Sequence, residues 1–505
     1  MKSLRAWIAV MAVVSTACAE EAPPPAAPAP PPPPPPVAAA EPPPPPPAAE
    51  KKLVTITTKS PDAKAALLRT WELIHNNRSE EALASCKQAL AADPDFALAH
   101  AAAGRLMTGA DAQAEVDKAM QLSTNLPEAE RLFIEGNASF RRHEMARYAA
   151  DFERVAELAP DDFHAQTWLG IVRDSRHDFD GAMAAYARVL ELYPAAAYAH
   201  GRIAGDHAQR REWDAALASA RKYVEGAPDE PWAHQSVAAA LLNLGQIKEA
   251  DAEMTRAVEI APKMRSPYYD LAAIKAVEGD FAGARDVLER SKAAEVLPSY
   301  SLFRESRTAW AELAEGKTKE AFAVLDASEK DADARKLHAP AEPARTRAWA
   351  LWLLGKPAEA IKAADAGLGR CERPELIASY KAGCTRDLLT VKTLALIQAR
   401  RAPDARQALA KLQEDAKGWS GDARGQAVLD VLSDEVAALE KKDAKVSWSA
   451  TLAKCPPDDS VITLSVLRQA EAAHDKAAAE QARKDLLARA RLEPAYPLVV
   501  RVMKR

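Results

Sequence analysis

The sequence predicts an all-α protein: a right-handed α-solenoid of antiparallel helix pairs, preceded by an export signal and a proline-rich linker. Alanine makes up about a fifth of the 505 residues and glycine only 19, a composition that favours helices over sheets. Prolines recur every 34 residues at Pro160, Pro194, Pro228 and Pro262. The chain divides into four predicted parts, which are a signal peptide at 1–17, a lipid-attachment cysteine with a disordered Pro/Ala-rich stalk at 18–59, well-formed repeats at 60–298, and degenerate repeats with C-terminal capping helices at 299–505.

Residues 1–17 have the pattern of a signal peptide. Two basic residues precede an apolar run from Ala6 to Val14, which is too short to span a membrane core of about 30 Å as a helix. Small residues then lead to Cys18, in a pattern that resembles the lipobox of bacterial lipoproteins, where the cysteine receives a diacylglyceryl group. A cysteine between two alanines also fits an ordinary signal-peptidase site, so lipidation and simple secretion both stay open. The resemblance to lipoprotein sorting favours the outer membrane.

From Pro23 to Pro47 the chain is almost entirely proline and alanine. Polyproline II geometry, at about 3.1 Å per residue, gives this stretch a reach of roughly 80 Å. We expect a disordered stalk that holds the rest of the chain away from its membrane. The sequence Ser60-Pro61-Asp62 then supplies an N-cap, a proline at the first helical position and an acid in the first turn, which predicts the start of the first helix.

The proline series sets the frame of the repeat, with unit starts predicted at Ala129, Phe163, Ala197, Pro231 and Arg265. In this frame the eighth residue is always small and the twentieth is alanine in four consecutive units. Two antiparallel helices approach to about 8–10 Å only where side chains are small. Each unit therefore contains two helices that cross at these positions.

This pattern resembles the tetratricopeptide repeat, which has a small eighth residue, alanine at the twentieth, a large twenty-fourth and proline at the thirty-second. The family's tryptophan at the fourth position and tyrosine at the eleventh are missing here. The resemblance implies a solenoid whose concave groove is lined by the first helix of each unit. Ala321 and Ala360, each after a glycine turn, indicate that degenerate repeats continue into the C-terminal third.

The predicted groove positions carry few cations, which argues against a clamp for acidic peptide tails. They do carry aromatic rings, which suggest a groove for an extended or helical segment of a partner. The candidate groove residues are Phe133, Phe140, His164, Tyr198, Trp232, Gln235 and Tyr269. Trp232 lies centrally among them and is the predicted anchor. The alternative, that some of these rings are buried between repeats, stays open.

No pattern predicts catalysis, and we expect no catalytic residue, no cofactor and no metal. The net charge of −5 supplies no basic field for nucleic acid. Gly316-Lys317-Thr318 imitates a phosphate loop, but its helical context predicts a turn and no nucleotide site. His143 begins a zinc-protease motif whose second histidine is replaced by Arg147, and Gly418-Trp419-Ser420-Gly421 has the wrong spacing for a serine nucleophile.

Beyond Cys18 the chain has four cysteines. Cys86 lies at a core position of its repeat and is predicted to be a buried thiol. An oxidising compartment permits one disulfide among the other three. We predict Cys371 to Cys384, with a bond to Cys455 as the open alternative.

Together these features predict a non-enzymatic scaffold that binds a protein or peptide in its concave face. It would be anchored by its N-terminal lipid in the periplasm, at the outer membrane, or else secreted to the periplasm. The alternative is a recruiting, regulatory or sensor subunit of an envelope enzyme or signalling complex. The sequence does not identify the partner.

Overall fold

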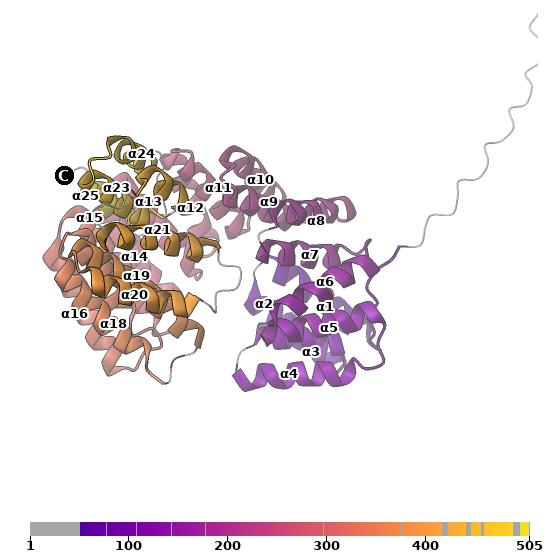
Figure 1. Cartoon of the computed structure of the whole chain (residues 1–505). Helices are drawn as coiled ribbons and strands as arrows, with labels where there is room; N and C mark the ends of the chain where they lie inside the picture. The colour runs from indigo at the N-terminus through magenta and orange to yellow at the C-terminus, as the bar shows by residue number, and fades with distance from the viewer. Residues whose placement is uncertain are drawn as a thin grey trace, which may run out of the picture. The chain divides into compact units, whose positions relative to one another are not determined.

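The computed structural model describes residues 51–503, apart from 77, 108, 143, 177, 296, 375, 377, 417–422, 441–445, 456–458 and 488–494 (Figure 1). Within the described residues the chain forms α-helices, one short 3₁₀ helix and no strand, which confirms the predicted all-α class. The predicted signal peptide, Cys18 and most of the stalk lie outside these residues. None of the helices described combines the length and the apolar character needed to cross a membrane.

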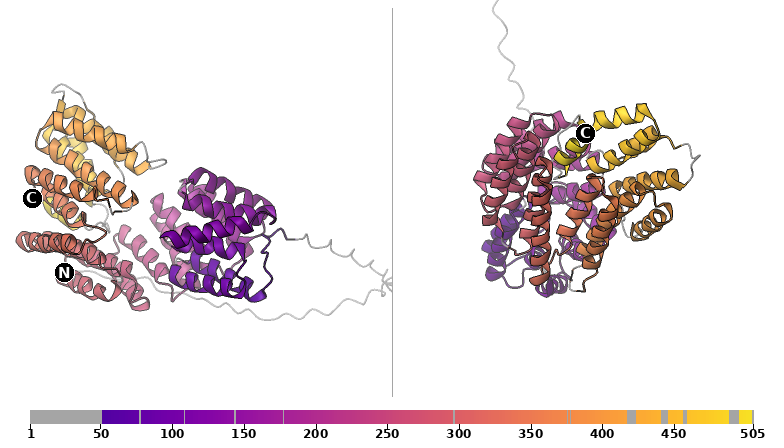
Figure 2. Two further views of the ribbon diagram at one scale, coloured as in Figure 1. Left: turned by 90° about the horizontal axis from the view of Figure 1, so that it is seen from below. Right: turned by 90° about the vertical axis from the view of Figure 1, so that its left-hand side faces the viewer.

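Antiparallel helix pairs follow one another along the described chain (Figure 2). The first fourteen helices are α1 (Pro61–His75), α2 (Ser79–Ala92), α3 (Ala97–Leu106), α4 (Gly109–Leu122), α5 (Glu128–Arg141), α6 (Met145–Leu158), α7 (Phe163–Ser175), α8 (Phe179–Leu192), α9 (Ala197–Gln209), α10 (Trp213–Gly226), α11 (Pro231–Asn243), α12 (Ile247–Ile260), α13 (Arg265–Glu278) and α14 (Phe281–Arg290), followed by the 3₁₀ helix η1 (Ser291–Ala294). The remaining helices are α15 (Tyr300–Glu315), α16 (Thr318–Ala334), α17 (Glu342–Leu353), α18 (Pro357–Cys371), α19 (Ala378–Gln398), α20 (Ala402–Ala416), α21 (Ala423–Glu440), α22 (Trp448–Lys454), α23 (Ser460–Ala472), α24 (Lys476–Leu487) and α25 (Tyr496–Met503).

The predicted repeat frame coincides with the helices. The first helices α7, α9, α11 and α13 begin at the predicted unit starts, and α5 begins one residue before its predicted start. The first helix also begins as predicted, because the Ser60 side chain accepts a hydrogen bond from the Ala63 amide and Pro61 occupies the first turn.

The small eighth residue makes room for the large twenty-fourth residue of the same unit. A Cβ at Gly136 would lie 2.6 Å from the Phe152 ring, and one at Gly170 would lie 2.4 Å from the Tyr186 ring. Both rings are fully buried. The nearest neighbour of these two glycines is therefore the ring, rather than the twentieth-position alanine that we expected to face them.

Turns within the helix pairs use residues with positive φ. Gly245 and Gly279 have φ of 77° and 89°, and Gly316 has φ of 103°. Gly316 ends α15 and Thr318 begins α16, so the phosphate-loop lookalike is the predicted tight turn between two helices. Glycine adopts this conformation without the steric cost that a Cβ brings.

The carbonyl oxygen of the repeating proline contacts a histidine in two of the units. His100 and His234, at the fourth position of their units, each place Nε2 2.9 Å from the carbonyl oxygen of the preceding proline, Pro94 and Pro228. Nδ1 of each ring meets a carboxylate of the second helix. The histidine at the fourth position therefore links a turn to the second helix of its unit, which is a structural role.

An extended segment, residues 51–60, crosses the turns of the first repeats before α1 begins. The Val54 amide donates to Asp162 at 3.1 Å, and the Thr57 amide and hydroxyl donate to the two carboxylate oxygens of Glu130 at 2.9 and 2.7 Å. Asp93 accepts from the Thr58 hydroxyl at 2.5 Å. Residues 51–59, which we expected to belong to the disordered stalk, are therefore part of the folded chain.

In the C-terminal third the first helices close into a ring. Helices α15, α17, α19, α21 and α23 contact one another in order, and α25 contacts both α23 and α15. Arg501 of α25 donates to the carbonyls of Leu313 and Ala314 at 3.0 Å, and Arg468 of α23 donates to the Leu353 carbonyl at 2.8 Å. The predicted terminal cap is thus more than an end piece, because its arginines cap the C-termini of α15 and α17.

Candidate functional site

The predicted groove is filled in the first repeats by side chains of α1. The Trp71 ring lies 4.9 Å from the rings of both Phe133 and His164. His75 lies 5.1 Å from the Tyr198 ring, and its Nε2 is 3.2 Å from Nδ1 of His164. Phe133, His164 and Tyr198 are consequently buried. The expectation that these three side chains line an exposed groove is wrong, because the bulky first helix occupies the space.

Burial also sets the charge state of the histidine pair. It lowers the pKa of His164 to about 3, and it lowers the pKa of His75, to which His164, Arg202 and Arg105 add repulsion of a second positive charge. Both rings are therefore neutral at neutral pH, and one donates its single N–H to the other. This arrangement is part of a core, since neither ring faces solvent.

Two further groove candidates are buried by the next first helix. Gln235 donates to Asp270 at 3.0 Å, and the Tyr269 hydroxyl donates to the Tyr300 carbonyl at 3.3 Å. Both side chains are buried, so the expectation of groove exposure is also wrong for Gln235 and Tyr269. Neighbouring first helices pack closely enough at this point to use these polar groups for each other.

The last two groove candidates keep some exposure. Phe140 is 37% exposed, and the Arg105 guanidinium lies 4.1 Å from its ring centroid. Trp232 is half-buried at the edge of a core cluster that contains Tyr198. The structure therefore does not bring the seven predicted residues together on one open surface.

An open cavity lies instead inside the C-terminal ring. Its volume is about 490 Å³, within the range of roughly 300–1,000 Å³ typical of ligand pockets. Its wall includes Arg307 and Trp310 of α15, Glu342, Arg345, Thr346 and Trp349 of α17, Arg386, Asp387 and Thr390 of α19, and apolar residues of α20, α21 and α23. First helices of the repeats thus form most of this wall.

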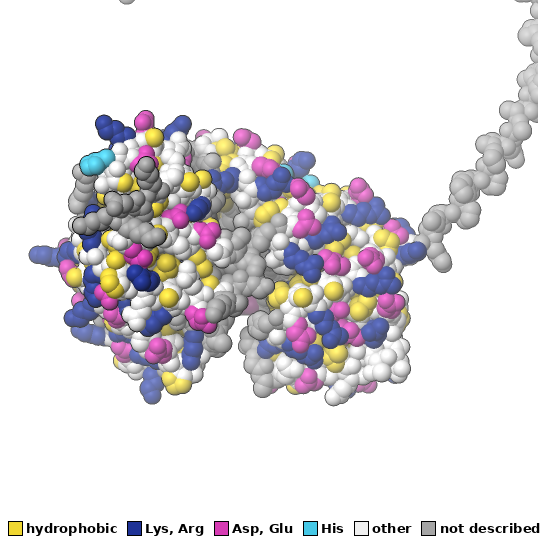
Figure 3. Space-filling model, in the orientation of Figure 1, with side chains coloured by type: hydrophobic (Ala, Val, Ile, Leu, Met, Phe, Trp, Pro, Cys, Tyr) yellow, Lys and Arg dark blue, Asp and Glu magenta, His cyan; other side chains and the backbone are white. Residues whose placement is uncertain are grey.

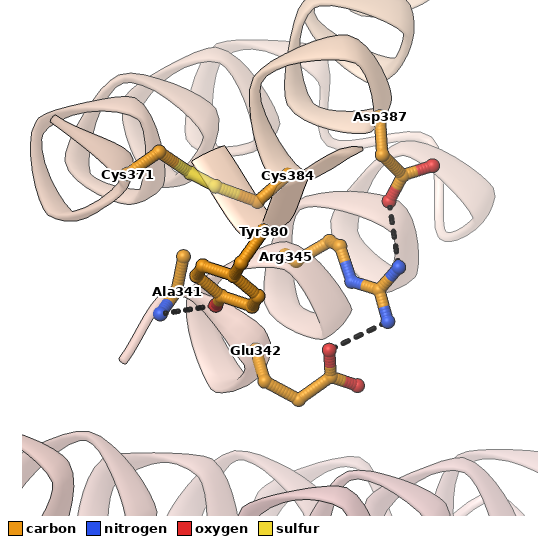
Figure 4. The surroundings of a disulfide bond; sticks show 7 residues. All are labelled: Ala341, Glu342, Arg345, Cys371, Tyr380, Cys384 and Asp387. Atoms are coloured by element: carbon orange, nitrogen blue, oxygen red, sulfur yellow. Dashed lines mark hydrogen bonds and ion pairs between the residues drawn. A yellow bond between two sulfur atoms is a disulfide. The ribbon is translucent and has the colours of Figure 1, made fainter. Parts of the chain in front are cut away.

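A charged cluster on α17 and α19 forms one side of the cavity (Figure 4). Arg345 pairs with Glu342 at 2.6 Å and with Asp387 at 3.2 Å. The Trp349 indole N–H donates to the same oxygen of Asp387 at 3.1 Å. The two carboxylates raise the pKa of Arg345 against the effect of burial. Within this cluster, Glu342, Arg345 and Asp387 each have a fixed partner.

The predicted disulfide braces that wall. Cys371, the last residue of α18, and Cys384 of α19 are joined, with Cα atoms 6.2 Å apart (Figure 4). One turn earlier in α19, the Tyr380 hydroxyl accepts a hydrogen bond from the Ala341 amide at 3.2 Å. Cys86 is fully buried, and burial raises the pKa of its thiol to about 12, in keeping with the predicted inert core thiol.

The described residues contain no cluster of side chains suited to a metal ion. No three His, Cys, Asp or Glu side chains among them are arranged to hold a metal ion. His143 and residues 418–421, the other motifs weighed from the sequence, lie outside the described residues. On the face shown in Figure 3, basic and acidic side chains are interspersed, without a broad patch of one sign.

Sequence reasoning missed the cavity. A signal was present, since Glu342, Arg345, Thr346 and Trp349 recur at helical spacing and share one face of α17. These residues line a cavity only because α21, α23 and α25 close the ring, and those helices lie far along the chain. The paired helices, together with the cavity that their first helices enclose, define a helical-repeat protein.

Comparison with known proteins supports this class. Residues 233–264, which cover most of α11 and α12, match the tetratricopeptide repeat family model. These residues form a tetratricopeptide repeat, in keeping with the repeat pattern of the sequence. No curated protein sequence matches the chain.

Similarity to several solved structures was also found. The chain is similar to MamA from Desulfovibrio magneticus RS-1, at 18% identity over 33% of this chain and 95% of that chain, with a TM-score of 0.30. It is similar to the apo form of RapI, at 15% identity over 62% of this chain and 99% of that chain, with a TM-score of 0.42. It is also similar to pilF of Pseudomonas aeruginosa, at 13% identity over 41% and 90%, with a TM-score of 0.33.

Proposed function

We propose that the protein is a non-enzymatic interaction scaffold whose partner protein inserts side chains into the cavity of the C-terminal ring. One observation carries the proposal. The concave face is filled by α1 in the first repeats, whereas the first helices of the C-terminal ring leave a cavity of about 490 Å³ beside Trp310 and Trp349. Tryptophan and arginine are the side chains most enriched at the energetic centres of protein interfaces.

A paired truncation tests where the partner binds. Trp349→Ala removes a ring from the cavity wall, and Trp232→Ala removes the half-buried ring that the sequence predicted as the anchor. Each full-length variant is compared with the unaltered protein for thermal melting and for the proteins that copurify from solubilised envelopes. We expect Trp349→Ala to lose the dominant partner, by about 2 kcal/mol of binding, while Trp232→Ala keeps it.

The reverse result would contradict the proposal. If Trp232→Ala loses the partner with a normal melt and Trp349→Ala keeps it, the binding surface is at α11. A catalytic protein as the dominant partner would favour the alternative, a recruiting or regulatory subunit of an envelope enzyme.

The proposal includes a lipid anchor on Cys18 in the periplasmic leaflet of the outer membrane. It is supported by the lipobox-like sequence and by the proline-rich stretch that follows it. Cys18→Ala should move the protein from the membrane fraction to the soluble fraction, because the attached acyl chains supply the membrane affinity. A variant that still sediments with membranes to the same extent would rule out anchoring by this cysteine.

A further inference from the structure

Arg307 places a guanidinium at the cavity that has no ion-pair partner within the described part of the chain. It donates to the Phe303 carbonyl at 3.4 Å, and it lies 4.2 Å from the centroid of the Tyr269 ring. None of the described carboxylates forms an ion pair with it. A guanidinium carries several N–H donors in a fixed fork, so most of its donors are unused. Burial lowers the pKa of Arg307, with Glu342, Tyr269 and Asp270 opposing that effect.

The carboxylates nearest to Arg307 are already engaged elsewhere. Glu342 pairs with Arg345, which also holds Asp387. Asp270 accepts from Gln235 at 3.0 Å. Farther along the wall, Asp459 accepts the amides of Val461 and Ile462 at the start of α23. The cation at Arg307 therefore lacks a fixed counter-charge among the described residues, and an anion entering the cavity would supply one.

Part of the cavity wall is apolar. Trp310 lies one turn from Arg307 on α15, and α20, α21 and α23 contribute Leu412, Val428, Leu429 and Ile462. Such a surface gains free energy by covering an apolar group, at roughly 25 cal/mol per Å² removed from water. The cavity thus combines the Arg307 cation with a hydrophobic part of its wall.

We propose that the cavity binds a carboxylate joined to an apolar group, with the carboxylate on Arg307 and the apolar group beside Trp310 and Leu429. This proposal rests on the proposed function, which places ligand binding in the same cavity. The carboxylate could belong to a free acid or to the C-terminus of a partner chain that ends in an apolar side chain. Both sources present the same chemistry to the site.

Calorimetric titration of the full chain tests the proposal. The probes are 4-phenylbutyrate, 4-phenylbutanol and 4-phenylbutylamine, which differ only in the polar end, and a short uncharged peptide ending in leucine with a free or an amidated C-terminus. We expect 4-phenylbutyrate to bind at least about tenfold more tightly than the alcohol, and the amine to bind most weakly. If the free peptide binds more tightly than both the amidated peptide and 4-phenylbutyrate, the source of the carboxylate is the C-terminus of a partner chain. If 4-phenylbutyrate binds more tightly than the free peptide, the source is a free acid.

Three variants assign the preference to Arg307. Arg307→Met keeps the length of the side chain without its charge and should bring the acid and the alcohol to equal affinity. Arg307→Lys keeps the charge and should retain most of the preference. Arg256→Met, on the exposed side of α12, is the matched control and should change nothing. The thermal melt shows whether Arg307→Met folds. If it does not fold, the proposal is tested by the acid preference of Arg307→Lys and by the comparison of the probes on the unaltered chain.

Equal binding of acid and alcohol to the unaltered chain would overturn the proposal, and so would an acid preference that survives Arg307→Met. Failure of every probe to bind, with partner capture still lost in Trp349→Ala, would overturn this inference and leave the proposed function standing. Acid-selective binding with partner capture unaffected by Trp349→Ala would sustain the inference and overturn the proposed function.

Discussion

Burial holds single residues of this protein in protonation states that they would not have in water at neutral pH. Glu435 of α21 is fully buried, and burial raises the pKa of its carboxyl to about 8. Its one described hydrogen bond comes from the Ser465 hydroxyl at 3.0 Å. The carboxyl is therefore protonated in the folded protein at neutral pH, whereas an unfolded chain would ionise it near pH 4.5.

This difference predicts how stability depends on pH. Between about pH 4.5 and 8 the folded state binds one more proton than the unfolded state, so the contribution of Glu435 to stability is present at low pH and is lost as pH rises. Glu435→Gln mimics the protonated form and should raise stability at pH 7 by about 1–3 kcal/mol, with a smaller gain at pH 5. Thermal melts at the two pH values measure this, and an equal gain at both would contradict the assignment.

The buried histidines of the first repeats have the opposite effect on how stability depends on pH. The folded-state pKa values of His75 and His164 are lowered, so unfolding takes up protons as pH falls below about 6.5. The first repeats should therefore lose stability toward acid pH, while the neutral form of Glu435 favours the C-terminal ring there.

At the scale of the element, the local sequence was enough to predict where helices of the repeats begin. The starts of α7, α9, α11 and α13 could be predicted because each repeat carries its own small residues and its own proline. The filling of the groove by α1 could not be predicted in this way. Trp71 and His75 of α1 contact residues of later repeats only after the solenoid curves. These residues are Phe133, His164 and Tyr198. Spacing within one repeat says nothing about contacts between α1 and α9.

The disulfide acts on the elements that it joins. It closes a loop between α18 and α19 with a sequence separation of 13 residues. Replacing both Cys371 and Cys384 with serine should lower the stability of the C-terminal ring by about 2–4 kcal/mol, mostly by freeing the unfolded chain. Melting of the unaltered protein in reductant should show the same loss, and Cys455→Ser should show little change. A double variant that melts as the unaltered protein does would contradict a structural disulfide.

At the scale of the whole molecule, closure of the C-terminal ring joins residues far apart in the chain. The hydrogen bonds from Arg501 to Leu313 and Ala314 span 188 and 187 positions. No repeat pattern predicts them, which explains why the final helices were expected to be a simple end cap. Gly316 leaves the space that this contact needs, since a Cβ there would lie 2.2 Å from the Arg501 guanidinium.

Arg501→Met should therefore open the ring at α15. It keeps the apolar stem and removes the donors to two helix-terminal carbonyls, at an expected cost of about 1–3 kcal/mol. Hydrogen exchange should increase in the last turn of α15 and in α25, while α5 to α12 stay protected. Arg256→Met serves as the surface control. Unchanged exchange in α15 would show that the ring does not depend on this contact.

We propose that the partner binds in the C-terminal cavity and not in the groove of the first repeats. The most direct measurement replaces Trp349, and separately Trp232, with the photoreactive aromatic residue benzoylphenylalanine in cells and identifies the proteins that crosslink to each. The account predicts a specific partner adduct from position 349 and none from position 232. An adduct from position 232 alone would contradict the claim and return the binding site to the groove.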